Sequence, residues 1–239
     1  MTKQELVGKM QENQAYLPGK TVKLDFGDEG AIMLDGKNNQ VTEDNGAADT
    51  TIKVSWADWQ ADVRLGLEWL DARVPDAPLW LWGLRAGCLL AATDWGRPVN
   101  HLFWQPMAGG KLALQQFLRL KLAAEIAGGA SKGLMEQLKA ELAAGRPVEV
   151  AGYRLGSSLA SGLEAAKLAP AGTPGRVEWL ELSTREDAVL TPVSEQAIKS
   201  WQDAGWAVHP LIVQGPGFWA TSEIELAPAL IARTVEALS

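Results

Sequence analysis

Cysteine and histidine are the scarcest chemically active residues in this chain of 239 residues. A single cysteine, Cys88, excludes an internal disulfide framework and is typical of a reducing compartment. The two histidines are His101 and His209, and neither has a metal-ligand spacing such as H-E-x-x-H. We therefore expect no metal site, and no motif indicates a cofactor.

Long apolar runs and basic clusters are also missing. No stretch reaches about 18 uninterrupted apolar residues and the first twenty residues are polar, so we expect no membrane span and a cytoplasmic location. The formal net charge is -7, and no Lys/Arg run resembles a stripe that follows a phosphate backbone. This argues against nucleic acid as a partner.

Tryptophan, in contrast, is abundant and unevenly placed. The chain has 11 tryptophans against 2 tyrosines and 4 phenylalanines, and none of the tryptophans precedes Trp56. With 47% hydrophobic residues, the chain can form one large core or two modest ones. The uneven distribution indicates a composite chain.

The first quarter of the sequence has the pattern of a helix followed by an antiparallel β-meander. Residues 2–15 are amphipathic with a helical period. Residues 21–26 and 31–34 flank the turn-forming Gly27-Asp28-Glu29-Gly30, which predicts a hairpin. Residues 50–56 alternate in hydrophobicity and predict a third strand that includes Trp56.

Beyond residue 57, predicted helices and strands alternate. Such alternation predicts an α/β fold with a parallel sheet covered by helices on both faces, in which ligands bind beyond the carboxyl ends of the strands. We therefore predict two domains, residues 1–57 and residues 58–239. The expected helices are 58–73 with Asp58 as N-cap, 88–94, 112–127, 131–144, 194–204 and 227–238, and the expected strands are 79–82, 99–104, 177–182 and 207–213.

The most informative stretch is Gly83-Leu84-Arg85-Ala86-Gly87, between a predicted strand and a predicted helix. This is the context of the nucleophile elbow, whose pattern is G-x-S-x-G. Here the central residue is Arg85. A guanidinium stays protonated in proteins and cannot form an acyl-enzyme, so the residue that identifies an ordinary esterase is missing.

Four segments in order carry a family resemblance: WLWGLRAG (80–87), LFWQP (102–106), QFLRLKLAA (116–124) and FWATSEI (218–224). They resemble the exosortase A system-associated hydrolase type 2 proteins, an α/β-hydrolase-like family of bacterial exopolysaccharide loci. The resemblance covers about three quarters of the chain. It implies an α/β-hydrolase-like fold, and an arginine at the elbow is common in this family.

A second resemblance lies in the first quarter. LPGKTVKLDFGDEG (17–30) and ADTTIKV (48–54) are similar to the opening half of an SCP2 sterol-carrier domain. The second half of that domain has no counterpart. The early H-G-F or H-G-G-type loop of a complete α/β-hydrolase is missing as well. We therefore expect an incomplete hydrolase-like sheet, lacking its first strands, joined near residues 56–62 to part of a sterol-carrier domain.

In α/β-hydrolases the catalytic residues follow the order nucleophile, acid, histidine. Arg85 stands at the first position. The acid would follow the strand at 177–182, where Asp187 lies beside Glu186. The histidine would follow the last strand, where the chain has Phe218, and phenylalanine cannot shuttle a proton. We expect a degenerate triad, and whether any catalysis remains is open.

The other reactive groups are expected to be structural. Cys88 lies one turn into the helix after Arg85, a position typical of a small buried hydrophobe rather than a nucleophile. His101 and His209 lie in apolar strands, where core histidines are more common than catalytic ones.

Two roles are open for Arg85. Its forked donors can hold a carboxylate or phosphate of a ligand. Alternatively, it pairs with Asp187 or Glu186 and holds the remnant site together. Residues 116–127 form either a lid helix or an ordinary half-buried helix. The residues expected to bind a ligand, all near predicted strand ends, are Arg85, Trp104, Gln105, Phe218 and Trp219.

Three functions follow as alternatives. The first is an accessory or binding role for a hydrolase-like protein of an exopolysaccharide and exosortase A system. The second is a lipid or sterol carrier, and the third is weak ester or thioester hydrolysis at a non-standard site. The expected partners are a small-molecule or acyl ligand and a second copy of the chain, bound through an open sheet edge.

Overall fold

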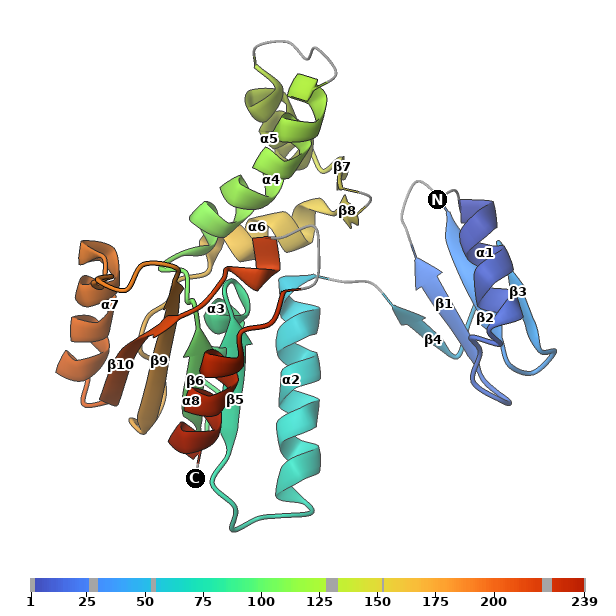
Figure 1. Cartoon of the computed structure of the whole chain (residues 1–239). Coiled ribbons are helices and arrows are strands. Elements are labelled where there is room, and N and C mark those ends of the chain that lie inside the picture. The colour runs from blue at the N-terminus through green and yellow to red at the C-terminus, as the bar shows by residue number, and fades with distance from the viewer. Residues whose placement is uncertain are drawn as a thin grey trace.

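The computed structural model describes residues 3–25, 30–52, 55–127, 133–151, 153–220 and 225–238. Within these residues the strands form two four-stranded sheets, ordered β3-β2-β1-β4 and β10-β9-β6-β5, and a separate hairpin of β7 and β8 (Figure 1). The fold is mixed α/β, with a parallel sheet flanked by helices and additional antiparallel strands.

The first sheet contains a strand pairing that differs from a meander. β1 and β2 pair antiparallel, which confirms the predicted hairpin, but β4 pairs parallel with β1. Because β3 lies outside β2, the chain crosses back to the free side of β1 and arrives in the same direction as β1. The purely antiparallel meander is therefore wrong. The elements are α1 Lys3–Glu12, β1 Thr21–Asp25, β2 Ala31–Asp35, β3 Gln40–Thr42, which was not expected, and β4 Thr50–Ile52.

Helix α2, Trp56–Asp71, begins earlier than the sequence predicts. Ser55 is its N-cap: its hydroxyl accepts from Asp58 N at 3.1 Å, and the Asp58 carboxylate accepts from Ser55 N at 2.6 Å. This capping box satisfies two end groups at once. Trp56 is therefore helical rather than part of a strand, and Asp58 is the third helical residue rather than the N-cap. The division at residues 57 and 58 stays a prediction.

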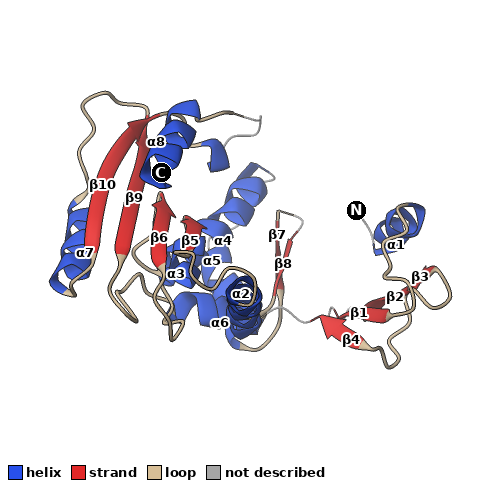
Figure 2. Ribbon diagram, turned by 90° about the horizontal axis from the view of Figure 1, so that it is seen from below, coloured by secondary structure: helices blue, strands red, loops and turns tan. Residues whose placement is uncertain are grey.

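The second sheet confirms the parallel arrangement. Its strands are β5 Trp80–Leu84, β6 Asn100–Trp104, β9 Arg176–Ser183 and β10 Ala207–Gln214, and all three neighbouring pairs are parallel. Figure 2 shows α8 on one face and α3 and α7 on the other. The helix bounds are α3 Gly87–Ala91, α7 Pro192–Asp203 and α8 Pro228–Leu238.

A hydrophobic core fills each side of this sheet. On one side, Leu102 and Leu180 of the sheet pack with Leu230 of α8. The opposite core is aromatic and includes Phe103, Trp179, Trp201 and Trp206, together with Cys88 from α3 and Ile198 from α7. Burial of such large rings removes much apolar surface from water and so stabilises this part.

The segment between β6 and β9, residues 110–165, forms an insertion that we name the cap. Its hydrophobic core is largely its own and includes Leu114, Leu118, Leu138, Leu142 and Val150. The chains that enter and leave it lie side by side, because Gly110 N donates to Ala166 O at 2.9 Å. Its elements are α4 Gly110–Ala127, α5 Leu134–Ala143, β7 Val148–Val150, β8 Tyr153–Leu155 and α6 Ser157–Ala165.

Strands β5 and β10 lie at the two edges of the parallel sheet as far as the structure describes the chain. Edge strands are the places where a second chain can pair. The predicted homodimer through such an edge stays a prediction. Among the described helices, none is long and apolar enough to cross a membrane.

The base of the cap gives a test of the fold. A Cβ on Gly110 would lie 1.6 Å from the Leu163 carbonyl oxygen, whereas a Cβ on Gly109 would meet nothing closer than 3.9 Å. We expect Gly110→Ala to lower the free energy of unfolding by about 3 kcal/mol or more, since backbone must move to admit the methyl group. Gly109→Ala should change it by less than about 1 kcal/mol. Urea unfolding of the two variants checks this, and equal midpoints would contradict the described packing at the cap's base.

Candidate functional site

The carboxyl ends of all four parallel strands meet at one edge of the sheet. β5 ends at Leu84 and β6 at Trp104, which are aligned partners, and β9 and β10 end at the aligned pair Ser183 and Gln214. The loops that follow these strands are therefore neighbours in space. In open α/β sheets this is the edge at which ligands bind.

The turn after β5 has the geometry of an elbow. Arg85 has a φ of 53°, in the left-handed region that residues with a side chain seldom adopt. Gly83 permits this tight turn, because a Cβ there would lie 2.6 Å from both N and Cα of Cys88. At Gly87 a Cβ would meet nothing within 4 Å. The first glycine of the motif is thus required by packing, and the second is not.

The guanidinium of Arg85 lies between the cap and the last loop of the sheet. It donates a hydrogen bond to the side-chain oxygen of Gln116 on α4 and lies 5.2 Å from the ring centre of Trp219. Arg85 is half-buried, and burial lowers the pKa of its guanidinium from the ordinary value. The group stays protonated at neutral pH because the ordinary pKa of an arginine lies far above 7.

The predicted pairing of Arg85 with Asp187 or Glu186 is wrong. Asp187 instead pairs with its neighbour Arg185, whose Nε and Nη2 lie 3.2 and 3.1 Å from the two carboxylate oxygens. Both side chains are exposed, at 71% for Arg185 and 80% for Asp187. Within the described part of the chain, no carboxylate forms a salt bridge with Arg85.

Four aromatic side chains form a continuous row that ends at Arg85. Trp82 packs edge-on against Trp104 at 4.5 Å between ring centres, Trp104 contacts Phe218 at 6.2 Å, and Phe218 contacts Trp219 at 5.2 Å. Phe218 and Trp219 belong to the short helix η2, Phe218–Ala220. The row brings three of the predicted ligand-binding residues, Trp104, Phe218 and Trp219, to the same side as Arg85.

Trp104 and Gln105 support the site from within the fold. Trp104 is buried, and its indole N–H donates to the Thr234 hydroxyl on α8 at 2.9 Å. Gln105 has a φ of 46°, and its side-chain oxygen accepts from Leu182 N at 2.7 Å. These contacts fix the ends of β6 and β9. Both side chains therefore hold the strand ends in place.

Gln116 is the member of the site that sequence analysis did not identify. It begins the QFLRLKLAA segment quoted above, but its partner Arg85 lies 31 residues earlier. The signal in the sequence is a polar amide among the apolar residues Ala113, Leu114 and Leu118 of a predicted helix. In the structure these three residues are buried and Gln116 is half-buried. A polar side chain in such a setting needs a partner.

Cys88 and the two histidines each have their own interaction partners. Cys88 is fully buried, its thiol lies 3.1 Å from Gly83 O, and burial raises the pKa of that thiol. His209 Nδ1 lies 2.8 Å from the carboxylate of Glu178, so its partner is a buried glutamate rather than a nucleophile.

His101 is enclosed by aromatic rings. Its ring centre lies 5.2 Å from that of Phe103, 5.3 Å from Trp201 and 5.0 Å from Trp206. Burial lowers its pKa to about 4, so the imidazole is neutral at pH 7. A fully buried ring in this cluster cannot reach a substrate, and a structural role follows.

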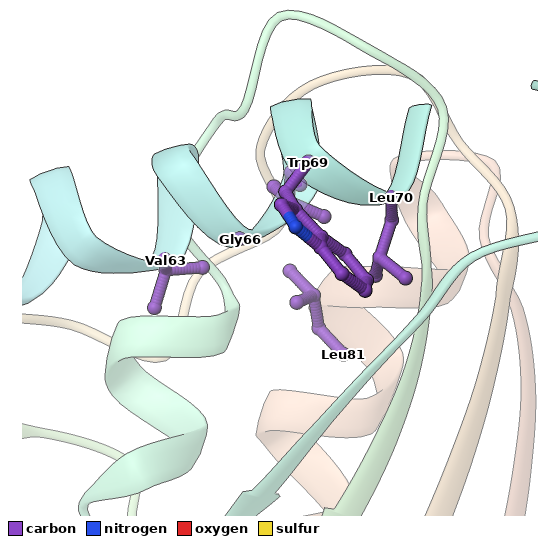
Figure 3. A pocket seen from close by; sticks show the side chains of 6 residues that line it. Val63, Gly66, Trp69, Leu70 and Leu81 are labelled. Atoms are coloured by element: carbon purple, nitrogen blue, oxygen red, sulfur yellow. The ribbon is translucent and has the colours of Figure 1, made fainter. Parts of the chain in front are cut away.

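Two cavities lie away from Arg85. An apolar groove of about 350 Å³ lies along α2, where Figure 3 shows Val63, Trp69 and Leu70 around Leu81. A second cavity of about 260 Å³ lies beside Glu178 and His209. Across the described residues, no group of three or more His, Cys, Asp or Glu side chains is arranged to hold a metal ion.

No protein family model and no curated protein matches the chain. Among solved structures, the chain is similar to the thioesterase domain of NocB, described in covalent complex with a fluorophosphonate nocardicin G analog. The two share 18% sequence identity with a TM-score of 0.32, over 69% of this chain and 66% of that chain's length. The family resemblances of the sequence stay predictions that rest on the quoted segments.

The burial of His101 predicts a pH dependence of stability. Its folded pKa of about 4 lies below the ordinary 6.5, so the unfolded state binds more protons between these values. The contribution of neutral His101 to the free energy of unfolding should be complete above about pH 6.5. It should decrease by roughly 3 kcal/mol as the pH falls toward 4. Urea unfolding across this range should show the fall in the wild type and in His209→Gln. His101→Phe should lack this component, and an unchanged profile in that variant would contradict the assignment.

Proposed function

We propose that the chain is an α/β-hydrolase-like binding protein whose strand-end site holds a small ligand without catalysing a reaction. The observation that supports this most directly is Arg85, which stands at the elbow with a φ of 53° where a nucleophile would stand. The position keeps the turn geometry of an elbow, but the side chain can bind and cannot be acylated.

The remaining triad positions agree with a binding role. Phe218 stands where the histidine would be, and Asp187 is an exposed partner of Arg185. Cys88 has no exposed surface and a raised thiol pKa, which removes the thiolate that a nucleophile needs. His101 is buried among the aromatic side chains of the core. The third alternative, weak hydrolysis at another site, thus has no described pair of nucleophile and base to support it.

In this proposal the ligand contacts Arg85, Phe218 and Trp219. Trp104 and Gln105 stabilise the strand ends beneath them. Aromatic faces beside a cation suit a ligand with an apolar or carbohydrate body and one polar group. The resemblance to exosortase A system-associated proteins adds the context of exopolysaccharide assembly, which rests on the four sequence segments alone.

The α2 groove favours a second candidate function. Its lining of Val63, Leu67, Trp69, Leu70 and Leu81 is apolar, and a volume of about 350 Å³ suits part of an acyl chain. A lipid-binding role would use this groove rather than the sterol-carrier-like residues 1–57, since all of the lining residues lie after them.

The absence of catalysis is tested with p-nitrophenyl esters and acyl-thioesters of several chain lengths. We expect no turnover above buffer for the wild type, and none for Arg85→Ser, because a serine at the elbow still lacks a histidine to accept its proton. The proposal would be contradicted if the purified wild type turned over a substrate and Arg85→Ser or Cys88→Ala lost that turnover.

The location of the ligand is tested by fluorescence titration with a dansyl-labelled fatty acid. Trp219→Ala should weaken binding about tenfold through the loss of one aromatic wall. Gly66→Leu, which fills the α2 groove at a position where a Cβ meets nothing within 4 Å, should leave it unchanged. The opposite pattern would favour the lipid-binding candidate.

A further inference from the structure

The immediate partner of the Arg85 cation is an uncharged amide. Arg85 is half-buried and donates to the Gln116 side-chain oxygen, with Trp219 beside it. Withdrawing a guanidinium from water costs free energy that a carboxylate commonly offsets. Two other arginines that are partly withdrawn from water are paired with carboxylates, Arg97 with Asp71 and Arg176 with Glu178. Arg85 departs from this pattern among the described residues.

Within the described residues, the geometry leaves donors of Arg85 available. A guanidinium has five N–H donors in a planar fork, and Gln116 takes a hydrogen bond from one nitrogen, Nη2. A neutral amide oxygen binds a guanidinium more weakly than a charged oxygen does, since charge-assisted hydrogen bonds are roughly twice as strong. An oxyanion that reaches this position would therefore compete successfully with Gln116.

The backbone holds this cation where a ligand can meet it. The φ of 53° at Arg85 costs free energy, and the close contact of Gly83 with Cys88 maintains it. Arg85 N also donates to Trp104 O at 2.9 Å, which fastens the turn to β6. The backbone that carries the guanidinium is thus already fixed, which lowers the entropic cost of binding a ligand.

We propose that Arg85 binds the carboxylate or phosphate of an anionic ligand, and that Gln116 is its resting partner, which the anion displaces. This deepens the proposed function and rests on it, because it names the chemical class of the ligand for the same site. Since Gln116 belongs to α4, binding of the anion releases the side-chain hydrogen bond that joins Arg85 to the cap.

Isothermal titration calorimetry with inorganic phosphate, hexanoate and the neutral hexanamide tests the proposal. The wild type should bind phosphate or hexanoate, and hexanamide should bind at least about tenfold more weakly than hexanoate. Binding of phosphate alone indicates a phosphorylated ligand, and binding of hexanoate alone indicates a carboxylate on an apolar body. Binding of hexanamide as tight as that of hexanoate, or no binding of either phosphate or hexanoate, overturns the assignment.

Substitutions at Gln116 should act in opposite directions. Gln116→Ala removes the internal competitor and should tighten anion binding about threefold, whereas Gln116→Glu supplies a permanent carboxylate and should weaken it about tenfold or more. Binding that is unchanged in Gln116→Glu contradicts the proposal. Thermal unfolding of each variant establishes that it is folded.

Removal of the cation completes the test. Arg85→Met should abolish detectable anion binding, while Arg185→Met, which removes an equal charge at the same edge of the sheet, should not. Equal losses in both would mean general electrostatic attraction and overturn the proposal. The dansyl titration is independent of this result: if Trp219→Ala weakens probe binding but anions bind without Arg85, the binding function stands and the anion assignment fails.

Discussion

The close contact between β5 and α3 is the constraint on which the site depends. Because Gly83 has no Cβ, the backbone of Cys88 can lie directly against the strand, and the chain must turn through a left-handed residue between them. That residue is Arg85. The contact explains why Cys88 is buried while Arg85, three positions earlier, reaches the sheet edge.

The side chain at this turn determines what the site can do. A hydroxyl there would need a base, and the described residues near it supply an amide and aromatic rings instead. A cation over an aromatic ring, with a neutral partner, is suited to recognition of charge. In our proposal, the same strand-end edge that positions reactive groups in open α/β sheets serves to bind a ligand here.

The cap contributes to the site through one helix. α4 packs with Ala113 on the sheet core and with Leu114 and Leu118 on the cap core. Gln116 lies between these residues in sequence, so the position of its amide depends on how α4 packs against both the sheet and the rest of the cap. The close approach of Gly110 to the backbone of Leu163 adds a further contact at the base of the cap.

Much of the fold could be predicted from sequence because local patterns determine it. The long apolar strand predicted at 177–182 corresponds to Arg176–Ser183, and the strand at 207–213 to Ala207–Gln214. The errors lie where distant contacts decide. β4 pairs in parallel with β1 because β3 occupies the outer side of β2 and leaves the other side of β1 free. Strands of three residues such as β7 are too short to show a period.

The candidate site divides in the same way. The elbow at Arg85 is visible in the spacing of Gly83 and Gly87, whereas its partner is not, because Gln116 reaches it from 31 residues away across the cap. Asp187 illustrates the opposite case. Its position in sequence agreed with a catalytic acid, but Arg185 two residues earlier offers a nearer partner.

The most direct measurement of the central claim is the ¹⁵N–¹H spectrum of the arginine side chains, with the Arg85 signals assigned by their loss in Arg85→Met. If Arg85 is a binding group held by Gln116, its side-chain signals will move progressively as phosphate or hexanoate is added, while those of Arg233 stay in place. Signals of Arg85 that remain unchanged at saturating anion would contradict the account.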